Sequence, residues 1–492
     1  MRHATIASWP MLPREVRSIA GWLLLATAVA CRGAAAGPNV LFIAVDDLRP
    51  ELGCYGSRTA SSPHIDALAA SGVRFDRGYC QFALCNPSRS SLLSGRRPET
   101  LGVVTLARFF RDGNPGIVTL PEHFRLHGYE SRSYGKIFHV TNGNHDDPPS
   151  WSAPPWPERK PRPAAATGGR IVDETADHSH EDPWGAPDCG DDDLIDGKIA
   201  ARAVAALGEL RDRPFFLAVG FHKPHLPFVA PKRYWDRHDS ASFAPPADDR
   251  LPESAPAFAS NDSSELRRYQ GIPASGPPVT AAESRRLIHG YHACVTYVDA
   301  QVGRVLAELD RLGLADRTVV VLWGDHGYHL GEKATWTKRT NWETATRVPL
   351  IVRAPGLESV GAQPAHTGAI VELLDIYPTL VDLCGLPRPE GLEGRSLRPL
   401  LENPKAHWDG VARSMIAKTV AEPGDEPITG RAVRTPRWRW IEWTGPPLAE
   451  PVHELYAHQA DPAETRTLAG TPEGKQAIAE LRSRHPAAAV NR

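Results

Sequence analysis

The sequence predicts an α/β protein in which helices cover both faces of a large β-sheet, followed by a small C-terminal subdomain. Three short apolar runs, residues 39–45, 214–220 and 318–324, support the first part of this prediction. They lack the alternation of apolar and polar residues that marks a half-buried strand, so they are typical of strands buried on both faces of a parallel sheet. The segments between them are expected to supply the covering helices.

Acids and histidines follow all three runs. In parallel sheets, ligands bind beyond the carboxyl ends of the strands. Three strand ends of the same polar kind therefore predict a single functional site at this edge of the sheet. The side chains concerned are Asp46, Asp47, His222, His225, Asp325 and His326.

Three segments have the spacing of amphipathic helices. Apolar residues recur every three or four positions over 287–309, 199–210 and 371–383, which predicts helices with one buried face. Residues 142–190 and 240–285 are rich in proline and are expected to form long loops. Long loops in compact domains are often functional.

The pattern changes after about residue 405. Residues 433–443 and 452–456 are expected to be strands of a small antiparallel sheet, and 472–484 a final helix. The chain is accordingly divided into a larger domain, residues 37–404, and a C-terminal subdomain, residues 405–492.

The composition excludes two broad classes of protein. Of 492 residues, 41% are hydrophobic and 23% are charged, so the chain can bury a sizeable core and is not a long disordered one. The formal net charge is −2, and no global positive charge draws the chain to nucleic acid or to an anionic membrane. A polyanionic substrate would need local positive charge.

Residues 1–36 are expected to be an export signal. Arg14 and Arg17 precede an apolar run of twelve residues, 19–30. This length suits a signal sequence and is shorter than the roughly 20 residues that span a membrane. The expected location is periplasmic or secreted. Acylation of Cys31 would instead make the protein an outer-surface lipoprotein, and a disordered tail is the remaining alternative.

The segment from Cys85 to Arg96, Cys-Asn-Pro-Ser-Arg-Ser-Ser-Leu-Leu-Ser-Gly-Arg, contains the candidate nucleophile. Pro87 suits the first turn of a helix. That would put Cys85 at a helix N-terminus, where the backbone N–H groups and the helix dipole favour anions. Arg89 would lie one turn away on the same face. These residues alone leave Cys85 as a thiolate nucleophile or an ordinary buried cysteine.

The pattern Cys-x-Pro-Ser-Arg followed by a Gly-Arg pair resembles the signature of the sulfatase family, in which the cysteine is oxidised to formylglycine. The resemblance extends over nearly the whole mature chain, and within the family it is greatest to the iduronate-2-sulfatases. It implies the fold of the alkaline-phosphatase superfamily: a large mixed sheet sandwiched by helices, with a C-terminal subdomain of antiparallel sheet plus helix. The matching stretches are residues 39–50, 52–56, 135–139, 144–147 with Trp151, 215–225, 325–327 with 330–332, 336–338, 453–456 and 461–464.

The resemblance also implies a metal site beside Cys85. Asp46, Asp47 and Asp325 supply oxygen ligands that suit a hard cation, Ca²⁺ in preference to Mg²⁺. His326 stands where most sulfatases carry Asn and the iduronate enzymes carry His. It is included as a ligand, although an imidazole nitrogen is an unusual partner for such an ion. Formylglycine at Cys85 would complete the ligand set.

By the same resemblance, the formylglycine hydrate is the nucleophile. One of its hydroxyls attacks sulfur and expels the alcohol, and deprotonation of the other then ejects sulfate. Arg89 and Lys136 would orient the hydrate, and Lys136 and Lys338 would hold the sulfate. His139 is the expected base and His225 the expected acid for the leaving oxygen.

The sequence thus predicts a sulfuric ester hydrolase that acts on a sulfated saccharide and needs a separate formylglycine-generating enzyme for its maturation. The first candidate substrate is the 2-O-sulfate of an iduronate-type uronic acid. Tyr328, which is expected near the pocket together with His329, stands where the iduronate enzymes carry Trp, so the sugar stays open. The alternatives are a sulfatase for another polysaccharide, such as an algal one, a formylglycine-dependent phosphodiester or phosphonate hydrolase, and an inert glycan-binding relative.

Overall fold

A computed structural model describes seven stretches of the chain: residues 37–141, 144–156, 181–276, 279–357, 364–418, 426–446 and 448–485. The predicted export signal, residues 1–36, lies outside them, as do residues 157–180 of the first long loop. Among the described residues, every helix is too short or too polar to span a membrane.

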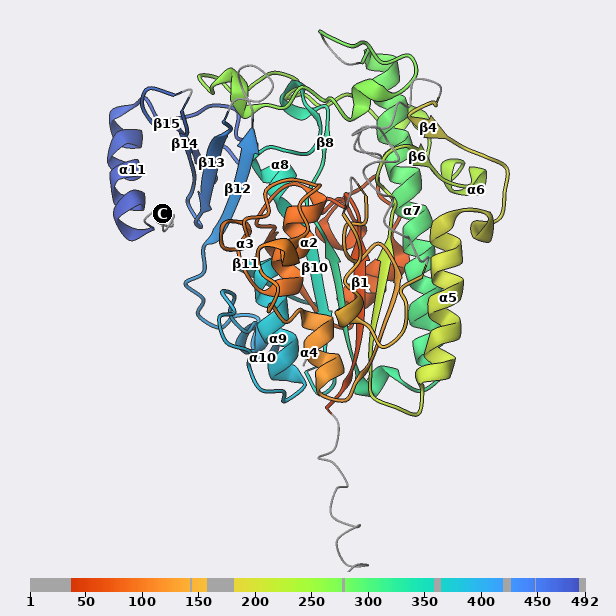
Figure 1. The fold of residues 1–492 in the computed structure, drawn as a ribbon. Coiled ribbons are helices and arrows are strands. Elements are labelled where there is room, and N and C mark those ends of the chain that lie inside the picture. The colour runs from red at the N-terminus through yellow and green to blue at the C-terminus, as the bar shows by residue number, and fades with distance from the viewer. Residues whose placement is uncertain are drawn as a thin grey trace, which may run out of the picture. The chain divides into compact units, whose positions relative to one another are not determined.

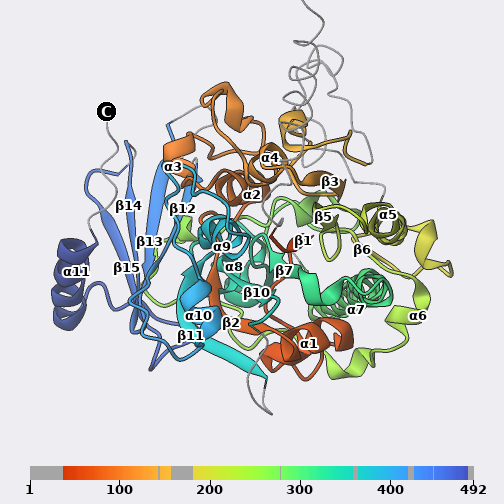
Figure 2. The same cartoon turned by 90° about the horizontal axis from the view of Figure 1, so that it is seen from below.

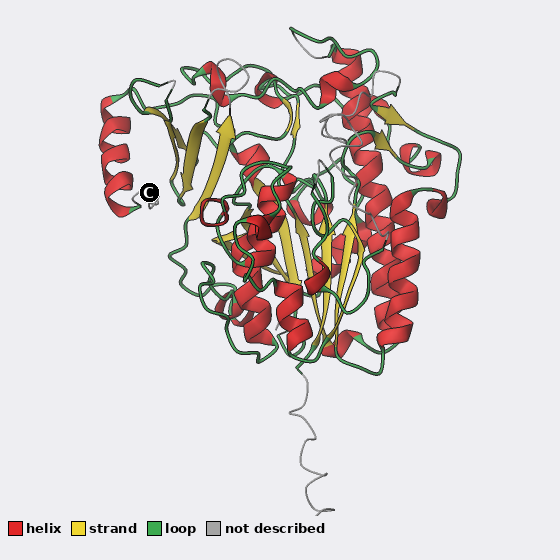
Figure 3. Cartoon of the chain, viewed as in Figure 1, coloured by secondary structure: helices red, strands yellow, loops and turns green. Residues whose placement is uncertain are grey.

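The centre of the fold is a mixed sheet (Figures 1 and 3). In the described part of the chain it has seven strands in the order β11-β2-β10-β7-β1-β5-β3. Neighbouring strands are parallel except where β10 pairs with β2 and β7. The predicted mixed sheet is therefore confirmed. Its strands are β1 (Asn39–Val45), β2 (Val73–Tyr79), β3 (Glu130–Gly135), β5 (Phe215–Phe221), β7 (Thr318–Gly324), β10 (Arg347–Arg353) and β11 (Ala365–Glu372).

The three predicted apolar runs form adjacent strands in the middle of this sheet. β1 lies between β5 and β7 and is parallel to both. Val45, the last residue of β1, is in register with Phe221 of β5 and with Gly324 of β7. Because the three strands end at the same level, the polar residues that follow them are brought to one edge of the sheet.

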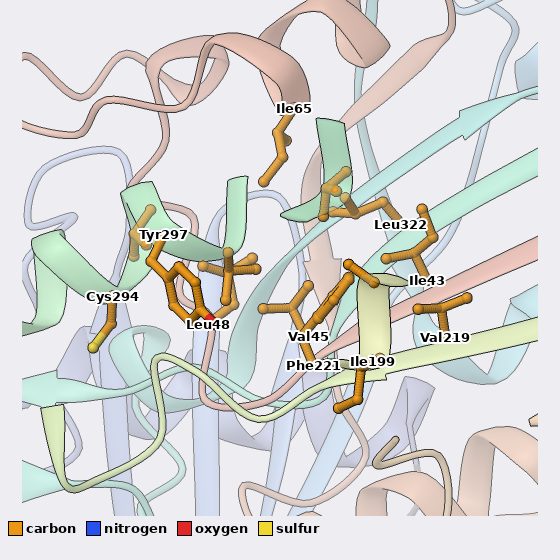
Figure 4. Packing of buried hydrophobic residues seen from close by; sticks show 14 of the residues in the cluster. Ile43, Val45, Leu48, Ile65, Ile199, Val219, Phe221, Cys294, Tyr297 and Leu322 are labelled. Carbon is orange, nitrogen blue, oxygen red and sulfur yellow. The ribbon is translucent and has the colours of Figure 1, made fainter. Parts of the chain in front are cut away.

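Two hydrophobic cores explain why these strands are apolar throughout. Leu41, Ile43 and Val45 belong to one core with helices α1, α5 and α7, and the alternate residues of β1 belong to another with α2, α4 and α9. Figure 2 shows the two helical layers, and Figure 4 shows the first core in detail. Successive strand residues point to opposite faces, so burial on both faces requires apolar residues at every position.

The remaining elements connect or flank this sandwich. The helices are α1 (Pro63–Ala70), α2 (Cys85–Ser94), α3 (Pro98–Leu101), α4 (Leu120–Leu126), α5 (Ile195–Leu210), α6 (Lys232–Trp235), α7 (Ala281–Arg311), α8 (Glu343–Thr346), α9 (Ile376–Leu383) and α10 (Arg398–Glu402). The short strands are β4 (Trp184–Gly185), β6 (Phe228–Val229), β8 (His329–Leu330) and β9 (Trp336–Thr337). The six cysteines in the described stretches are all free.

Two predicted elements differ from the structure. The helix expected over 371–383 begins only at Ile376, because Val371 and Glu372 end strand β11 and a 3₁₀ turn follows. The Glu372 carboxylate pairs with Arg97, and this tertiary contact holds the strand end. The strand expected over 433–443 is a hairpin of two strands, with a turn closed by a hydrogen bond from the Thr435 amide to the Trp438 carbonyl.

The C-terminal part forms the predicted antiparallel sheet with a final helix. The strand order is β12 (Ala412–Lys418), β13 (Ile428–Arg434), β14 (Trp438–Thr444) and β15 (Val452–Ala457), and α11 (Pro472–Arg484) packs against it. Arg439 of β14 is buried and binds both Glu343 of α8 and Glu464. This ion-pair cluster fastens the small sheet to the edge of the sandwich that carries the polar strand ends.

Candidate active site

The candidate site lies where β1 and β7 end beside the N-terminus of α2. Asp46 and Asp47 follow β1, Asp325 and His326 follow β7, and Cys85 is the first residue of α2. All five residues are fully buried. One ligand atom from each of four of them, Asp46, Asp47, Cys85 and His326, lies within 4.8 Å of the others. The structure therefore brings together the side chains that the sequence predicted to share a site.

The backbone at Asp47 is in the left-handed region, with φ of 58°. Such a conformation is costly for a residue with a side chain and needs support from its surroundings. The Asp47 amide donates to Asp325 Oδ1 at 3.0 Å, and its carbonyl accepts from the Tyr291 hydroxyl at 2.9 Å. These contacts hold the turn that directs two successive carboxylates into the site.

Arg89 links the carboxylates of two strand ends. Its Nη2 donates to Asp46 Oδ1 at 3.0 Å, and its Nε donates to Asp325 Oδ2 at 2.9 Å. Its Nη1 donates to the carbonyls of Lys136 and Ile137. The planar guanidinium thereby joins α2 to β1, β7 and the segment after β3, as its fork of donors allows.

Two lysines complete the positive charge. Lys136 Nζ donates to Asp46 Oδ2 and lies 3.7 Å from Cys85 Sγ. Lys338 Nζ donates to both Asp47 oxygens, at 3.1 and 3.2 Å. Three cations therefore surround the position where an anionic group would meet Cys85.

The three predicted histidines lie around the same point. His326 Nε2 is 3.3 Å from Cys85 Sγ, and its Nδ1 donates to the Gly327 carbonyl. His225 Nδ1 donates to the Leu226 carbonyl at 2.7 Å. A carbonyl can only accept, so in both rings Nδ1 carries the proton and Nε2 faces the site. The third ring, that of His139, hydrogen-bonds through Nε2 to the Thr141 hydroxyl at 2.8 Å.

Burial and neighbouring charges shift the pKa values of the site residues in different directions. Burial tends to raise the pKa of Asp46, but Lys136 and Arg89 lower it well below its ordinary value. Burial raises the pKa of Asp47 well above its ordinary value, against the effect of Lys338. Burial and the neighbouring Asp46 also raise the pKa of the Cys85 thiol. An unmodified Cys85 is therefore a neutral thiol and a poor nucleophile.

Both catalytic candidates among the histidines favour the neutral form. Burial and Lys136 lower the pKa of His139 well below its ordinary value. Burial and Lys338 lower the pKa of His225 to about 3, while Glu265 acts in the opposite direction. A neutral His139 is suited to accept a proton, whereas His225 needs added negative charge nearby before it carries one.

The residues present fit a divalent cation. The donors that face one another are mainly carboxylate oxygens, which hard cations prefer. The pKa of Asp47 is raised by burial and by three neighbouring carboxylates, so a cation there would relieve a repulsion that Lys338 offsets only in part. Asp325 binds Arg89 and the Asp47 amide and lies 3.6 Å from His326 Nε2.

Glu265 is a site residue that the sequence did not indicate. Its carboxylate accepts from Lys338 Nζ at 3.1 Å and lies 3.2 Å from His225 Nε2. It belongs to the second predicted long loop, which in the structure ends where α7 begins at Ala281, and neither its spacing nor its neighbours match a motif. The side chains of His225 and Glu265 are 20% and 14% exposed, whereas Lys338 is fully buried, so the site is open on their side.

One further acid and two buried rings lie behind the site and support it. Asp196, at the start of α5, accepts from the amides of His222 and Lys223 at 2.8 and 2.9 Å and so holds the loop that leads to His225. Tyr328 is fully buried in ring contacts with Phe228 and Tyr291. His329 is equally buried and hydrogen-bonds to the Thr340 hydroxyl.

Comparisons with known proteins identify the family. The sulfatase family model matches residues 38–386, and the model of the C-terminal part of N-sulphoglucosamine sulphohydrolase matches residues 331–489. The chain is 33% identical to mouse iduronate 2-sulfatase, over 87% of this chain and 90% of the relative.

Solved structures share the fold. The phosphonate monoester hydrolase of Agrobacterium radiobacter superimposes with a TM-score of 0.73 at 23% identity and covers 91% of this chain and 96% of its own. A structure described as a 2-O glycosaminoglycan sulfatase superimposes with a TM-score of 0.65 at 25% identity and covers 91% of both chains. The predicted alkaline-phosphatase-like sulfatase fold is confirmed, and the chain belongs to the sulfatase family of enzymes.

Proposed function

We propose that this sulfatase removes the 2-O-sulfate of an iduronate-type uronic acid from a glycan, with a formylglycine made from Cys85 as its nucleophile. The observation that carries the proposal is the placement of Cys85 in its signature: it begins α2, with Asp46, His326 and Lys136 around its sulfur. Similarity to iduronate 2-sulfatase over most of the chain supports the choice of substrate, as does the fold shared with a 2-O glycosaminoglycan sulfatase.

The hydrated formylglycine would supply one hydroxyl to attack sulfur and a second whose deprotonation lets sulfate leave. Lys136 lies close enough to both Asp46 and position 85 to orient that group. Arg89, which pairs with the carboxylates of Asp46 and Asp325, would keep its positive charge close to that group. The neutral imidazole of His139 would accept the proton of the second hydroxyl. Preorganised charge of this kind stabilises the transition state without rearrangement.

Lys338 and His225 would act on the other side of the sulfate. Lys338 would bind a sulfate oxygen. Its ammonium lies inside the site, where it contacts Asp47. His225 would protonate the leaving alcohol oxygen, because it lies where the site is open. Sulfate binding would add negative charge beside Lys338 and so weaken the main charge that opposes a proton on His225.

A Ca²⁺ ion would be held by Asp46, Asp47, Asp325 and His326, together with the modified residue 85. It would supply positive charge that polarises a sulfate oxygen. Residues 1–36 would direct the protein to the periplasm or the medium, where sulfated glycans occur. A formylglycine-generating enzyme would be required as a maturation partner.

The reaction class can be tested with the purified protein after coexpression with a formylglycine-generating enzyme. Mass spectrometry of the peptide containing position 85 would measure the conversion of cysteine to formylglycine. Nitrophenyl sulfate and a nitrophenyl phosphonate ester would then be compared, with Cys85→Ala as the blank and Cys80→Ala as a buried control cysteine. We expect sulfate release that Cys85→Ala abolishes. Faster cleavage of the phosphonate would contradict the proposal.

A further inference from the structure

Glu265 lies between Lys338, the group assigned to the sulfate, and His225, the group assigned to the leaving oxygen. Its Oε1 accepts from Lys338 Nζ at 3.1 Å and is 3.2 Å from His225 Nε2, and its Oε2 is also 3.1 Å from Lys338 Nζ. One carboxylate thus contacts both the ammonium assigned to the sulfate and the imidazole assigned to the leaving oxygen.

The contacts of Lys338 leave its ammonium little freedom. An ammonium group has three N–H donors. Asp47 and Glu265 accept on two sides of Lys338 Nζ. Loss of Glu265 would remove one of these restraints and let the ammonium shift towards Asp47.

Glu265 also faces the ring of His225. Its Nδ1 donates to the Leu226 carbonyl at 2.7 Å, and Glu265 lies beside Nε2. Once Nε2 is protonated, it can donate to the same carboxylate that Lys338 binds, and this shared acceptor sets its position relative to Lys338. This is the relation that a proton donor needs if the oxygen it protonates is attached to the sulfate that Lys338 holds.

The loop that carries Glu265 is anchored to the site and to the C-terminal sheet. The side chain of Asn261 donates to the carbonyl of Lys338. Lys418 of β12 donates to the three carbonyls of residues 258–260, at 2.6–3.1 Å. Because hydrogen bonds restrain the loop at both points, they also restrain the backbone that carries Glu265.

We propose that Glu265 is a positioning residue for this reaction, which fixes His225 against the leaving oxygen and Lys338 against the sulfate. The inference rests on the proposed sulfatase function. Once sulfate is bound, His225 takes up a proton from solvent on Nε2. When the bond between sulfur and the alcohol oxygen breaks, its electron pair stays on that oxygen, which takes this proton and leaves His225 neutral. Glu265 neither gives nor takes a proton in this step.

The dependence of the rate on the leaving group tests this role. A saccharide alcohol leaves only with a proton, whereas a nitrophenolate leaves without one. We expect Glu265→Gln to lower kcat about 10²-fold for a sulfated saccharide that the wild type cleaves, and less than about tenfold for nitrophenyl sulfate. Asp262→Asn, which removes an exposed charge from the same loop, should leave both rates unchanged.

A double-mutant comparison separates positioning from a general structural effect. With His225→Ala as the background, Glu265→Gln should cost less than about tenfold further activity on the saccharide, because the proton donor is already gone and only the effect through Lys338 remains. If Glu265→Gln does not fold, Glu265→Asp, which retains the charge but shortens its reach, should show a smaller loss with the same leaving-group dependence.

The outcomes distinguish this inference from the function it rests on. Equal losses on the two esters in Glu265→Gln, with wild-type turnover of both, would overturn the positioning role and leave the sulfatase intact. If the wild type cleaves neither sulfate ester, the proposed function fails and the inference falls with it.

Discussion

The Nε atom of Arg89 donates to Asp325 Oδ2 at 2.9 Å, although 236 residues separate the two in the chain and neither side chain is exposed. The contact locks the helix that begins with Cys85 to the end of strand β7. Because the same guanidinium also binds Asp46, one side chain sets the spacing between Cys85 and the carboxylates on both sides of it.

Replacing Arg89 by Lys should be strongly destabilising although the charge is kept. An ammonium cannot serve both carboxylates and two carbonyls in the geometry of the guanidinium, so a buried charge loses its partner. We expect a loss of about 3–5 kcal/mol in the free energy of unfolding, measured by urea denaturation. Arg311→Lys is the control, because that arginine is exposed on α7. If the Arg89→Lys variant were as stable as Arg311→Lys, the structural role assigned to the Arg89 guanidinium would be wrong.

Calcium should stabilise the protein through the carboxylate cluster. At a free concentration of 100 times its dissociation constant, a ligand of the native state adds about 2.7 kcal/mol. We expect chelation to lower the melting temperature and Ca²⁺ to restore it. Asp47→Asn should lose most of this response, whereas Asp212→Asn, 86% exposed in its side chain, should retain it. An equal response in both variants would place the ion elsewhere.

Asp196 should give the unfolding free energy a dependence on pH. Burial raises its pKa to about 6, from an ordinary 3.8, against two backbone donors. Between these values the native state binds more protons than the unfolded chain, so stability falls as pH rises through this window. For this group the fall is roughly 2–3 kcal/mol.

The variant Asp196→Asn should lack this contribution. Its stability relative to the wild type should therefore increase as the pH is raised from 4 to 7, as measured by urea denaturation at each pH. Asp310→Asn, on the exposed face of α7, should keep a constant offset. A constant offset in Asp196→Asn as well would show that Asp196 is not the titrating group.

The attachment of the C-terminal sheet should depend on Arg439. This buried side chain donates to Glu464 Oε1 at 2.6 Å and to the Asn341 carbonyl at 2.9 Å, and it also binds Glu343. Arg439→Met leaves two buried carboxylates short of a partner and should cost about 3–5 kcal/mol of unfolding free energy. Adding Glu464→Gln should recover part of that loss, because the buried charge is removed. No recovery in the double variant would exclude charge as the cause.

The central strands could be predicted because a single requirement, burial on both faces of the sheet, decides every residue in them. Strands β1, β5 and β7 are apolar throughout since both faces are buried, and the polar residues after them share one edge of the sheet. Strand β2 was not foreseen, because Arg74 and Asp76 interrupt its apolar pattern. Neither was the reversed direction of β10, which pairing with distant strands decides.

The residues of the site likewise fall into those that the sequence could predict and those that it could not. Cys85 and its neighbours could be predicted from local motifs, since the helix start and the strand ends fix them. Glu265 could not, because its place depends on Lys338 and His225, which are distant in sequence and reach it only through the folded loop. The start of α9 was missed for a related reason: the tertiary contact of Glu372 with Arg97 decides where β11 ends.

The central claim is tested most directly by sulfate release from defined sulfated saccharides, with protein matured to formylglycine and supplied with Ca²⁺. The panel contains a terminal 2-O-sulfated uronate, 6-O-sulfated glucosamine, 4- and 6-O-sulfated galactosamine and a sulfated algal oligosaccharide, with Cys85→Ala as the blank. We predict that the 2-O-sulfated uronate is cleaved with the highest kcat/KM. Cleavage confined to another member of the panel would contradict the assigned substrate, and no cleavage by fully matured protein would contradict the assigned reaction.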